Sequence, residues 1–523
     1  MTTENIIAER RSAKRTESLQ AVNPTTKTQL PDLFPVATEE EIDASVAAAH
    51  KAWKTYKQTT GKEKARFLRT IAKEIEQLGD VLINRAMAES GLPEGRIIGE
   101  RGRTCNQLRL FADLVEEGSW VDATIDEAMP DRQPLARADI RKMLVALGPV
   151  AVFTASNFPL AFSTAGGDTA SALAAGCTVV VKAHPSHLGT NALVATAITR
   201  ATEQCNLPEG VFSTLVGGIE TGQQLVKHPL IKAVGFTGSF RGGKALFDLV
   251  NSRPEPIPVY AEMGSNNPIF ILQEKLKTEQ EDLATMIAGS VNLGAGQFCT
   301  NPGLLVLQKS DTTTAFLQAL KDAFATLQSA TMLNEGIFES YQKGKAACIA
   351  AEGVSLVFSG ENPSSDWKGE PGFATVSGKR FLQNNHLQEE IFGPFTLAVL
   401  CEDAIEVNAI AQHLQGQLTA TIMGTTEELA NSTALIELLS QKAGRVIFNG
   451  VPTGVEVCPA MHHGGPFPAS SNALFTSVGT DAIKRFVRPV AFQDMPEMLL
   501  PKELKTENSL DIWRTVNGEK RRG

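Results

Sequence analysis

The 523-residue sequence is short of the features that mark membrane and secreted proteins. No uninterrupted apolar run approaches the roughly 18 residues that would cross a bilayer. Residues 1–20 are charged and lack the apolar segment of a secretory signal. These absences predict a cytoplasmic protein that has no membrane partner.

Cysteine and histidine are also arranged too sparsely for a disulfide framework or a familiar metal site. The seven cysteines form no C-x-x-C pair, and the eight histidines include no H-E-x-x-H spacing. The one adjacent pair, His462 and His463, fits a polar loop. We therefore expect no bound metal, and any important cysteine should act as a thiolate.

An excess of positive charge is missing as well. The chain has 49 Lys and Arg against 58 Asp and Glu, a formal net charge of −9, without a basic stretch that would attract nucleic acid. Its 42% hydrophobic and 20% charged residues are the proportions of an ordinary globular protein. At about 150 residues per domain, the length predicts two to four structural units.

What the sequence does contain is a helical region followed by alternating strands and helices. Residues 38–114 have a helical pattern, and Thr38 is a candidate cap. Beyond them, Val-rich runs at 143–155 and 178–181 flank an Ala-rich helical stretch that ends at Gly176. This βαβ pattern continues, so we predict an α/β fold with a doubly wound parallel sheet.

Residues 253–258 form a Pro-rich connection, and a second α/β series begins beyond Asn267. Its first strands are predicted at 268–272 and 303–308. Residues 361–373, rich in Pro, Ser and Gly, predict a surface loop, and residues 502–523 predict a polar, partly mobile tail.

Two segments near the carboxyl ends of predicted strands are candidates for binding a phosphate. At residues 235–243 a strand turns into a helix, where Gly238, the Ser239 hydroxyl and free backbone amides can meet an anion. Lys182 follows the strand at 178–181 and should project from the same edge of the sheet. Because the G-x-G-x-x-G fingerprint is absent, an ordinary glycine turn and a solvated lysine are the alternatives.

Three further residues are suited to chemistry on a carbonyl group. Cys299 lies in a Gly-rich loop at 294–303, where a thiolate can approach a ligand closely. Glu262 ends a predicted strand among apolar neighbours, which should raise its pKa and suit a general base. Asn157 follows another strand at that edge, where its amide can donate to an oxyanion. A buried structural cysteine, a solvated glutamate and a turn-forming asparagine are the alternatives.

In this order, the segments resemble the aldehyde dehydrogenase superfamily over nearly the whole chain. The matching segments are Val22-Asn23-Pro24, Asn157-Phe158-Pro159, Val180-Val181-Lys182, Phe236-Thr237-Gly238-Ser239, Glu262-Met263-Gly264, Gly296-Gln297-Phe298-Cys299 and Glu389-Glu390-Ile391-Phe392-Gly393-Pro394. The resemblance implies an oxidoreductase with two doubly wound parallel-sheet domains and a small oligomerisation segment. It implies a homodimer or homotetramer.

The resemblance also implies a reaction and the residues for it. The Cys299 thiolate adds to an aldehyde, Asn157 and the Cys299 backbone N–H hold the oxyanion, and a hydride leaves to a nicotinamide. Glu262 then activates the water that cleaves the thioester to a carboxylic acid. The implied cofactor residues are Lys182, Gly238, Ser239, Glu390 and Phe392.

One departure from the family pattern bears on the cofactor. Members that prefer NAD usually carry a carboxylate three residues after the lysine, whereas this chain has Pro185 there. A carboxylate would repel a 2′-phosphate, and Lys182 or His184 can attract one. We therefore predict a preference for NADP, with NAD as the alternative.

The resemblance is closest to the branch that contains 2-oxoglutarate semialdehyde (2,5-dioxopentanoate) dehydrogenases. A substrate with a distal carboxylate needs a cation, and Arg103 and Gln107 fall four residues apart on one helical face. A solvated helix arginine is the alternative for Arg103. An NADP-dependent fatty or medium-chain aldehyde dehydrogenase is the nearest rival function, while a cysteine hydrolase and a non-catalytic binding protein are the rivals from other classes.

The resemblance further divides the chain into three parts. Residues 1–266 hold the N-terminal helices and the dinucleotide-binding domain, with part of a bridging segment near 123–144. Residues 267–460 form the catalytic domain. Residues 461–523 return to the cofactor domain and add a second bridging segment near 488–500 and the tail.

Overall fold

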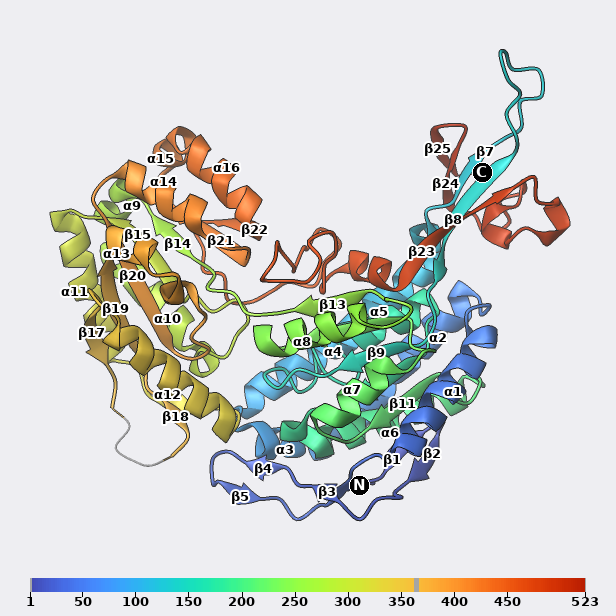
Figure 1. The fold of residues 1–523 in the computed structure, drawn as a ribbon, viewed down its shortest axis with the longest axis horizontal. Coiled ribbons are helices and arrows are strands. Elements are labelled where there is room, and N and C mark those ends of the chain that lie inside the picture. The colour runs from blue at the N-terminus through green and yellow to red at the C-terminus, as the bar shows by residue number, and fades with distance from the viewer. Residues whose placement is uncertain (1, 362–365, 523) are drawn as a thin grey trace.

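The computed structural model describes residues 2–361 and 366–522. Two lobes lie side by side, and a thin arm projects from the first lobe (Figure 1). The N-terminus lies at the base of the first lobe and the C-terminus in the arm. In the part of the chain that is described, no helix combines the length and apolar character needed to cross a membrane.

After several short strands, four helices of the first lobe form where the sequence predicts a helical region. They are α1 (Glu39–Tyr56), α2 (Gly61–Gln77), α3 (Gly79–Ser90) and α4 (Glu94–Glu117). Thr38 caps α1 as predicted: its hydroxyl accepts from the Glu41 backbone N–H, and the Glu41 carboxylate accepts from the Thr38 N–H. Helix α4 carries Arg103 and Gln107.

The first lobe is built around a sheet with the strand order β13-β12-β9-β10-β11-β1-β2. The five strands from β13 to β11 in this order are parallel, β1 pairs antiparallel with β11, and β2 pairs antiparallel with β1. The strands are β1 (Asn5–Ile7), β2 (Arg10–Ser12), β9 (Val150–Phe153), β10 (Val179–Lys182), β11 (Phe212–Leu215), β12 (Ala233–Thr237) and β13 (Val259–Glu262). The helices between them are α5 (Gly167–Ala175), α6 (Leu188–Gln204), α7 (Ile219–Lys227) and α8 (Phe240–Asn251).

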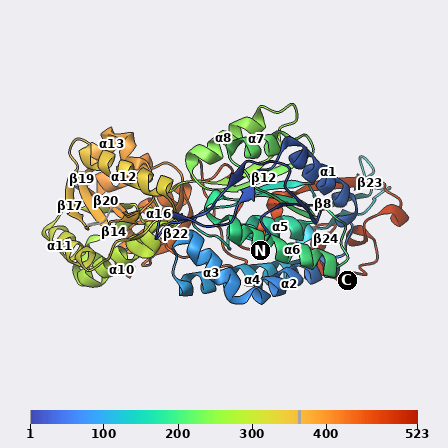
Figure 2. The same cartoon turned by 90° about the horizontal axis from the view of Figure 1, so that it is seen from below.

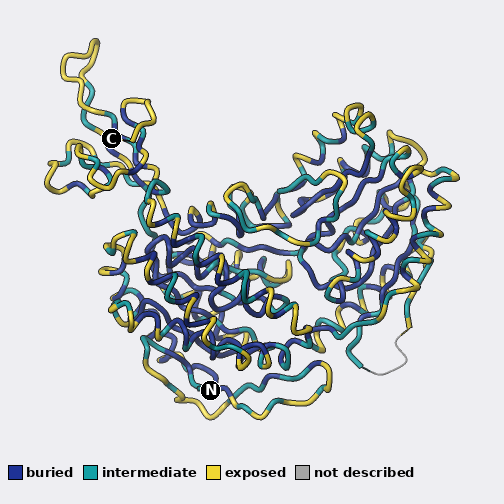
Figure 3. Tube along the Cα trace, turned by 180° about the vertical axis from the view of Figure 1, so that it is seen from behind, coloured by how far each residue is buried: buried dark blue, intermediate teal, exposed yellow. Residues whose placement is uncertain are grey.

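Both faces of this sheet are covered by helices. Figure 2 shows α1, α7 and α8 on one face and α2, α4, α5 and α6 on the other. Each face packs its own apolar cluster against the strands. The Val-rich strands are therefore buried on both sides, as the tube coloured by burial shows (Figure 3).

One predicted strand is wrong in its extent. The run at residues 143–155 is two strands, β8 (Ile140–Ala146) and β9, separated by Leu147, Gly148 and Pro149. Gly148 has a φ of +144°, which favours glycine, and proline cannot donate to a sheet ladder. The break lets β8 leave for the arm while β9 enters the first sheet.

The second lobe contains a seven-stranded sheet with the order β17-β19-β20-β15-β14-β21-β22. Its strands are β14 (Ile269–Ile271), β15 (Leu304–Gln308), β17 (Ser355–Ser359), β19 (Gly372–Ser377), β20 (Phe395–Cys401), β21 (Gln417–Met423) and β22 (Ala443–Phe448). Its longer helices are α10 (Gln280–Asn292), α11 (Asp311–Ala325), α12 (Glu335–Ala350), α14 (Ala404–His413) and α16 (Thr433–Lys442). Only β17 runs antiparallel to its neighbour in this sheet of the described chain.

The predicted loop at 361–373 is only partly a loop. Residues 362–365 lie outside the described residues. Lys368 and Gly369 form β18, which pairs with β16 (Ala330–Thr331), and Phe373 is fully buried in β19. The end of the predicted loop is thus a core strand.

The arm is a five-stranded sheet with the order β23-β8-β7-β24-β25. Its remaining strands are β7 (Thr124–Asp126), β23 (Val487–Gln493), β24 (Trp513–Val516) and β25 (Glu519–Arg522). The predicted partly mobile tail at 502–523 is therefore wrong over much of its length, because β24 pairs with β7 and with β25. Ile512 and Val516 are buried under this sheet and fix the tail to it.

Between the second lobe and the arm, the chain returns across the first lobe. Residues 463–477 lie against the end of β13, where Met263 donates its backbone N–H to the Ala469 carbonyl (2.8 Å) and Glu262 bridges to Ser470. This return segment brings residues far from β13 in sequence to the carboxyl end of the first sheet.

Candidate active site

Cys299 is held at the end of a short, unusually bent loop. The preceding turn, η3 (Leu293–Gly296), has positive φ values at Gly294, Ala295 and Gly296. A Cβ on Gly296 would stand 2.2 Å from the backbone of Gly393. Glycine is therefore required at Gly296 both by its φ of +67° and by this close approach of two backbone segments.

Two buried asparagines hold the loop in place through hydrogen bonds. The Asn267 side chain donates to the carbonyl oxygens of Cys299 and Asn301, both at 2.9 Å. Asn301 in turn donates to the Gly393 carbonyl (3.1 Å). These bonds tie the Cys299 loop to the end of the first lobe and to the Glu390 segment, so the sulfur has a fixed position.

Two other reactive groups lie near the Cys299 sulfur. The Nε2 atom of His463 lies 3.4 Å from Cys299 Sγ and 3.1 Å from Glu262 Oε1. The other oxygen of Glu262 accepts a 2.5 Å hydrogen bond from the Ser477 hydroxyl. Glu262 ends β13, whereas His463 and Ser477 come from the return segment, so the cluster forms only in the folded chain.

Burial and these contacts act in opposite directions on the two acidic groups. Burial alone would raise the pKa of Glu262, but the neighbouring His463 and hydrogen bonds from His463, Ser477 and Cys299 outweigh it, so its pKa is lowered. The predicted rise in the pKa of Glu262 is therefore wrong. The pKa of the Cys299 thiol is raised well above its usual value by burial and by the Glu262 carboxylate.

Asn157 approaches the same loop from β9. Its side-chain amide donates to the Gln297 carbonyl (3.1 Å), two residues before Cys299. Within the described chain the backbone N–H of Cys299 has no acceptor, so it is free to bond an oxygen added from outside. The predicted trio of Cys299, Glu262 and Asn157 is thus brought together at one place.

A cluster of phenylalanines and two arginines, Arg96 and Arg103, lie next to these residues. Phe158 packs edge-on against both Phe162 and Phe298, with ring centroids 5.2 and 5.5 Å apart. The Arg103 guanidinium lies 5.4 Å from the Phe162 ring centroid, and its Nε and one terminal nitrogen are buried without a hydrogen-bond partner in the described chain. Burial lowers the pKa of Arg103, and the Cys299 thiolate and Glu100 act against that change.

Gln107 lies one turn further along α4. Its amide nitrogen is buried without a partner among the described residues, against Gly167 at the start of α5. The backbone carbonyl of Ser477 lies beside the same glycine. Gln107 is therefore directed toward the return segment behind Glu262, and not toward the aromatic walls that Arg103 faces.

Comparison with known proteins identifies the family of the chain. The model of the aldehyde dehydrogenase family matches residues 11–488. The chain is 46% identical to an alpha-ketoglutaric semialdehyde dehydrogenase of Acinetobacter baylyi over 97% of both chains. It is 47% identical to alpha-ketoglutaric semialdehyde dehydrogenase 2 of Azospirillum brasilense over 93% of both.

The chain belongs to the aldehyde dehydrogenase family.

Structural similarity extends to more distant members of the fold. A solved lactaldehyde dehydrogenase superposes with a TM-score of 0.81 at 20% identity, covering 94% of this chain and 98% of the other. The predicted α/β fold is confirmed. As an aldehyde dehydrogenase, the protein is an oxidoreductase that converts an aldehyde to a carboxylic acid with a nicotinamide dinucleotide, NAD or NADP.

The carboxyl edge of the first sheet in this aldehyde dehydrogenase fits a dinucleotide. Lys182 ends β10, and its ammonium group has no ion pair or hydrogen bond within the described chain. Burial lowers its pKa to about 8. The Ser239 oxygen caps α8 by accepting from the Gly242 N–H (3.3 Å), which leaves the hydroxyl proton free to donate at the positive end of that helix.

Two other predicted cofactor residues have different surroundings from those expected. Gly238 uses its backbone N–H to bond the Glu262 carbonyl (3.1 Å), so that amide is not free for a phosphate. His184 accepts from the Ser186 N–H through Nδ1 (3.1 Å), and burial, His187 and Lys182 lower its pKa well below the usual value. His184 is therefore a neutral donor through Nε2 at neutral pH, and the attraction expected from its charge is absent.

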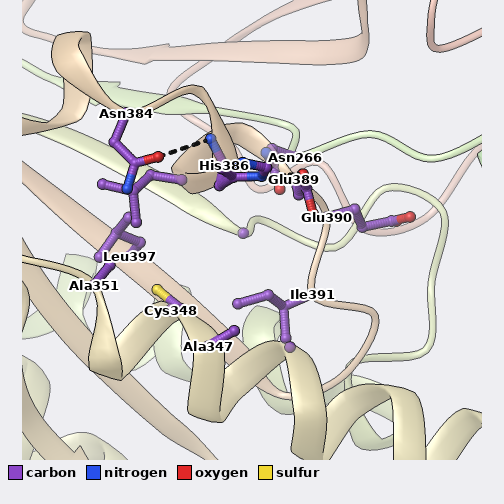
Figure 4. Close-up of a pocket in the computed structure, with 13 residues that line it drawn as sticks. Asn266, Ala347, Cys348, Ala351, Asn384, His386, Glu389, Glu390, Ile391 and Leu397 are labelled. Carbon is purple, nitrogen blue, oxygen red and sulfur yellow. Dashed lines mark hydrogen bonds and ion pairs between the residues drawn. The ribbon is translucent and has the colours of Figure 1, made fainter.

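Glu390 and Phe392 lie in the second lobe, in the segment just before β20. Burial raises the pKa of Glu390 to about 7, and Phe392 is half-buried. Glu390 borders a cavity of about 320 Å³ between α12 and β20, with Cys348 on the cavity's far wall (Figure 4). The Glu390 carboxylate points away from Cys348 and toward Gly264, and the described residues that line this cavity do not include Cys299, Glu262 or His463.

The sequence reasoning missed three residues of the site. His463 was interpreted as part of a polar loop, although it lies between Cys299 and Glu262. Apart from its position shortly after β13, nothing in the sequence around Asn267 indicates a role in the site. Glu100 lies on α4, and its carboxylate accepts from the backbone N–H groups of Leu160 (2.8 Å) and Ala161 (3.0 Å), which positions the loop that follows Asn157.

Proposed function

We propose that this protein oxidises 2-oxoglutarate semialdehyde to 2-oxoglutarate, with Cys299 as the nucleophile. The observation that carries the proposal is the buried Arg103 guanidinium, which faces the Cys299 site and lacks a partner for two of its nitrogens within the described chain. A substrate carboxylate would satisfy both nitrogens at once. The printed names of the two relatives that share 46% and 47% of the sequence support the same substrate.

The reaction begins with a proton leaving the Cys299 thiol. Because the pKa of this thiol is raised, a base must take the proton, and His463 Nε2 lies 3.4 Å from the sulfur. The Glu262 carboxylate can only accept a hydrogen bond, and the Nδ1 atom of His463 is buried without a partner among the described residues, so these contacts favour a proton on Nε2. Once that proton has shifted to Nδ1, Nε2 can accept from the thiol, and the resulting imidazolium is held beside the Glu262 carboxylate.

The thiolate then adds to the aldehyde carbon. The new oxyanion is held by the Asn157 amide and by the backbone N–H of Cys299. A bound nicotinamide supplies the acceptor for the hydride, which converts the adduct to a thioester on Cys299. Arg103 holds the distal carboxylate, so the carbonyl carbon is kept in front of the sulfur.

Glu262 completes the cycle by activating water. Its lowered pKa keeps it ionised at neutral pH, as a general base requires. Ser477 holds one oxygen at 2.5 Å, which leaves the other oxygen facing Cys299 and His463. Water deprotonated there cleaves the thioester, releases the carboxylic acid and restores the thiol.

We further propose NADP as the preferred cofactor, with NAD used less well. The residues that would hold it are Lys182 at the 2′-phosphate, Ser239 at the pyrophosphate, and Glu390 and Phe392 on the nicotinamide side. The half-buried ammonium of Lys182, which has no partner among the described residues, and the neutral Pro185 support this preference. His184 contributes a neutral hydrogen-bond donor.

A second candidate substrate is a fatty or medium-chain aldehyde. The three phenylalanines in front of Cys299 favour it, because they offer an apolar surface to an alkyl chain. The unpaired Arg103 guanidinium disfavours it, since an alkyl chain cannot satisfy a buried cation.

The arm supports a proposal on assembly. Its sheet carries both predicted bridging segments, β7 with β8 and β23. Met498 and Leu499, just beyond β23, are 82% and 62% exposed. We propose that the arm joins copies of the chain into a homodimer or homotetramer.

The decisive experiment measures aldehyde oxidation with NAD and NADP separately. The substrates are 2,5-dioxopentanoate and pentanal, which have the same chain length, followed by a fatty aldehyde series. We expect the highest kcat/KM with 2,5-dioxopentanoate and NADP. A higher kcat/KM with pentanal or longer alkanals would contradict the semialdehyde assignment, and a higher value with NAD would contradict the cofactor preference.

A further inference from the structure

We propose that Cys299, His463 and Glu262 also form a binding site for Zn²⁺, and that the ion reversibly blocks the catalytic centre. The three side chains each offer one ligand atom, and these atoms all lie within 4.8 Å of one another. The sequence does not reveal this set, because His463 lies 164 residues from Cys299 and 201 from Glu262. The inference does not depend on which aldehyde is oxidised.

The spacing of the ligand atoms suits a tetrahedral ion. Zinc binds thiolate sulfur at about 2.3 Å and imidazole nitrogen or carboxylate oxygen at about 2.0–2.1 Å, which places tetrahedral ligand atoms about 3.3–3.6 Å apart. In the structure Cys299 Sγ and His463 Nε2 are 3.4 Å apart, and His463 Nε2 and Glu262 Oε1 are 3.1 Å apart. Cys299 Sγ and the Glu262 carboxylate lie within 4.8 Å of each other, so this pair must close somewhat for all three side chains to bind one ion.

The chemistry of the three groups is that of a zinc site with one open position. Thiolate, imidazole and carboxylate are the ligands that zinc prefers, and the fourth position would face the space in front of Phe162, where water or substrate lies. On binding, the Cys299 thiol releases its proton to solvent and a sulfur–zinc bond forms, without transfer of electrons. With the sulfur bonded to zinc, it cannot add to an aldehyde.

The surroundings limit how tightly the ion is held. Ser477 donates a hydrogen bond to the Glu262 carboxylate and so orients it. Groups that bond to a metal ligand, and not to the metal itself, commonly have this role. The Nδ1 atom of His463 has no such partner in the described chain, and the Arg103 guanidinium repels a second cation. We therefore expect reversible inhibition that a chelator relieves.

The test uses the full-length protein and Co²⁺, whose bond to a thiolate gives a charge-transfer absorption band. One equivalent of Co²⁺ should produce this band, and Zn²⁺ should abolish it. The band should be absent in Cys299→Ser. Loss of a group that only hydrogen-bonds to a metal ligand lowers metal affinity by ~10–100-fold. Because His463→Gln and Glu262→Gln each remove a ligand itself, the affinity for Co²⁺ should fall by more than that in both variants.

Matched controls use neighbouring residues outside the cluster. His462→Gln and Cys458→Ser should keep the band and the affinity, and Arg103→Met should tighten binding because it removes a positive charge. Zn²⁺ should also protect Cys299 from alkylation by iodoacetamide, measured by mass spectrometry of the peptide.

Several outcomes would overturn the proposal. These are the absence of a thiolate band, a band that persists in Cys299→Ser, a band lost in Cys458→Ser, or unchanged Co²⁺ affinity in both His463→Gln and Glu262→Gln. Circular dichroism of each variant separates a lost ligand from a lost fold. A variant that unfolds is replaced by His463→Asn or Glu262→Ala, so that each ligand is tested in a folded protein.

Discussion

We propose Arg103 as the residue that connects the fold to a particular substrate. Its side chain is partly buried against Phe158 and Phe162, and within the described chain two of its nitrogens have no partner. A hydrogen bond to a charged group contributes about 1.5–3 kcal/mol, so Arg103→Met should lower kcat/KM for 2,5-dioxopentanoate by about 10- to 100-fold. The loss with pentanal should be small, as steady-state kinetics with both substrates will measure.

The control for this variant is Arg101→Met on the same helix, which should leave both kcat/KM values nearly unchanged. Equal losses with 2,5-dioxopentanoate and pentanal in Arg103→Met would show that Arg103 supports the site without binding the carboxylate.

His463 is the residue that we expect to control the reactivity of the thiol. His463→Gln keeps a polar side chain but removes the base, so kcat/KM should fall by about 10²-fold or more. Cys299 should also react more slowly with iodoacetamide at neutral pH, because less thiolate is present. The alkylation rate needs no cofactor and is the direct measurement. If alkylation in His463→Gln matches that in His462→Gln, then Glu262 alone takes the thiol proton.

Lys182 should make the use of NADP depend on pH. Its pKa is about 8 in the cofactor-free protein, so its charge is largely present at pH 7 and largely lost at pH 9. A 2′-phosphate binds the charged form, and the KM for NADP should therefore rise from pH 7 to pH 9 more steeply than the KM for NAD. The measurement is KM against pH for both cofactors. In Lys182→Met the two curves should run parallel, and parallel curves in the unmodified protein would contradict the assignment.

Among the secondary-structure elements, the turn η3 before Cys299 depends on glycine at Gly296. A Cβ on Gly296 would stand 2.2 Å from Gly393 backbone atoms, and strain at a positive φ adds about 1–3 kcal/mol. Gly296→Ala should therefore displace the loop and lower kcat by about 10²-fold, since a shift of about 1 Å costs that much.

The matched control is Gly289→Ala inside α10, where a new Cβ meets nothing within 4 Å. That change should leave kcat intact and raise the stability by about 0.5–1 kcal/mol, because alanine favours a helix over glycine. Thermal melting and steady-state kinetics of both variants provide the comparison. Wild-type kcat in Gly296→Ala would mean that the loop accepts another conformation.

At the scale of the whole molecule, we expect the arm to determine how copies of the chain associate. It stands apart from both lobes in Figures 1 and 3 and ends in exposed apolar side chains. If it joins copies of the chain, Met498→Glu combined with Leu499→Glu should reduce the molar mass in solution, because buried charges would oppose association. Light scattering after gel filtration measures this mass. Ile405→Glu in α14, also highly exposed, should have no effect, and an unchanged mass in the double variant would contradict an interface at these two residues.

Much of the fold could be predicted because local patterns specify it. Thr38 and Glu41 cap α1 through their own side chains, and Val-rich runs such as residues 179–181 form strands wherever both faces are covered. The edge where Lys182, Ser239 and Glu262 meet follows from the parallel order of the strands. The extent of β8 and β9 was predicted wrongly because a Gly-Pro break at 148–149 outweighs a continuous apolar run.

The sequence by itself determined the α/β class and the family, and it proposed the cysteine, glutamate and asparagine of the candidate site, because each of these lies in a contiguous motif. Only the tertiary structure decided what surrounds them. His463 and Ser477 reach Glu262 because the chain returns across the first lobe, and a contact between residues about 200 positions apart has no local signature. The sign of the pKa change of Glu262 depends on those two neighbours, because burial and hydrogen bonding oppose each other and only the folded contacts decide which is larger.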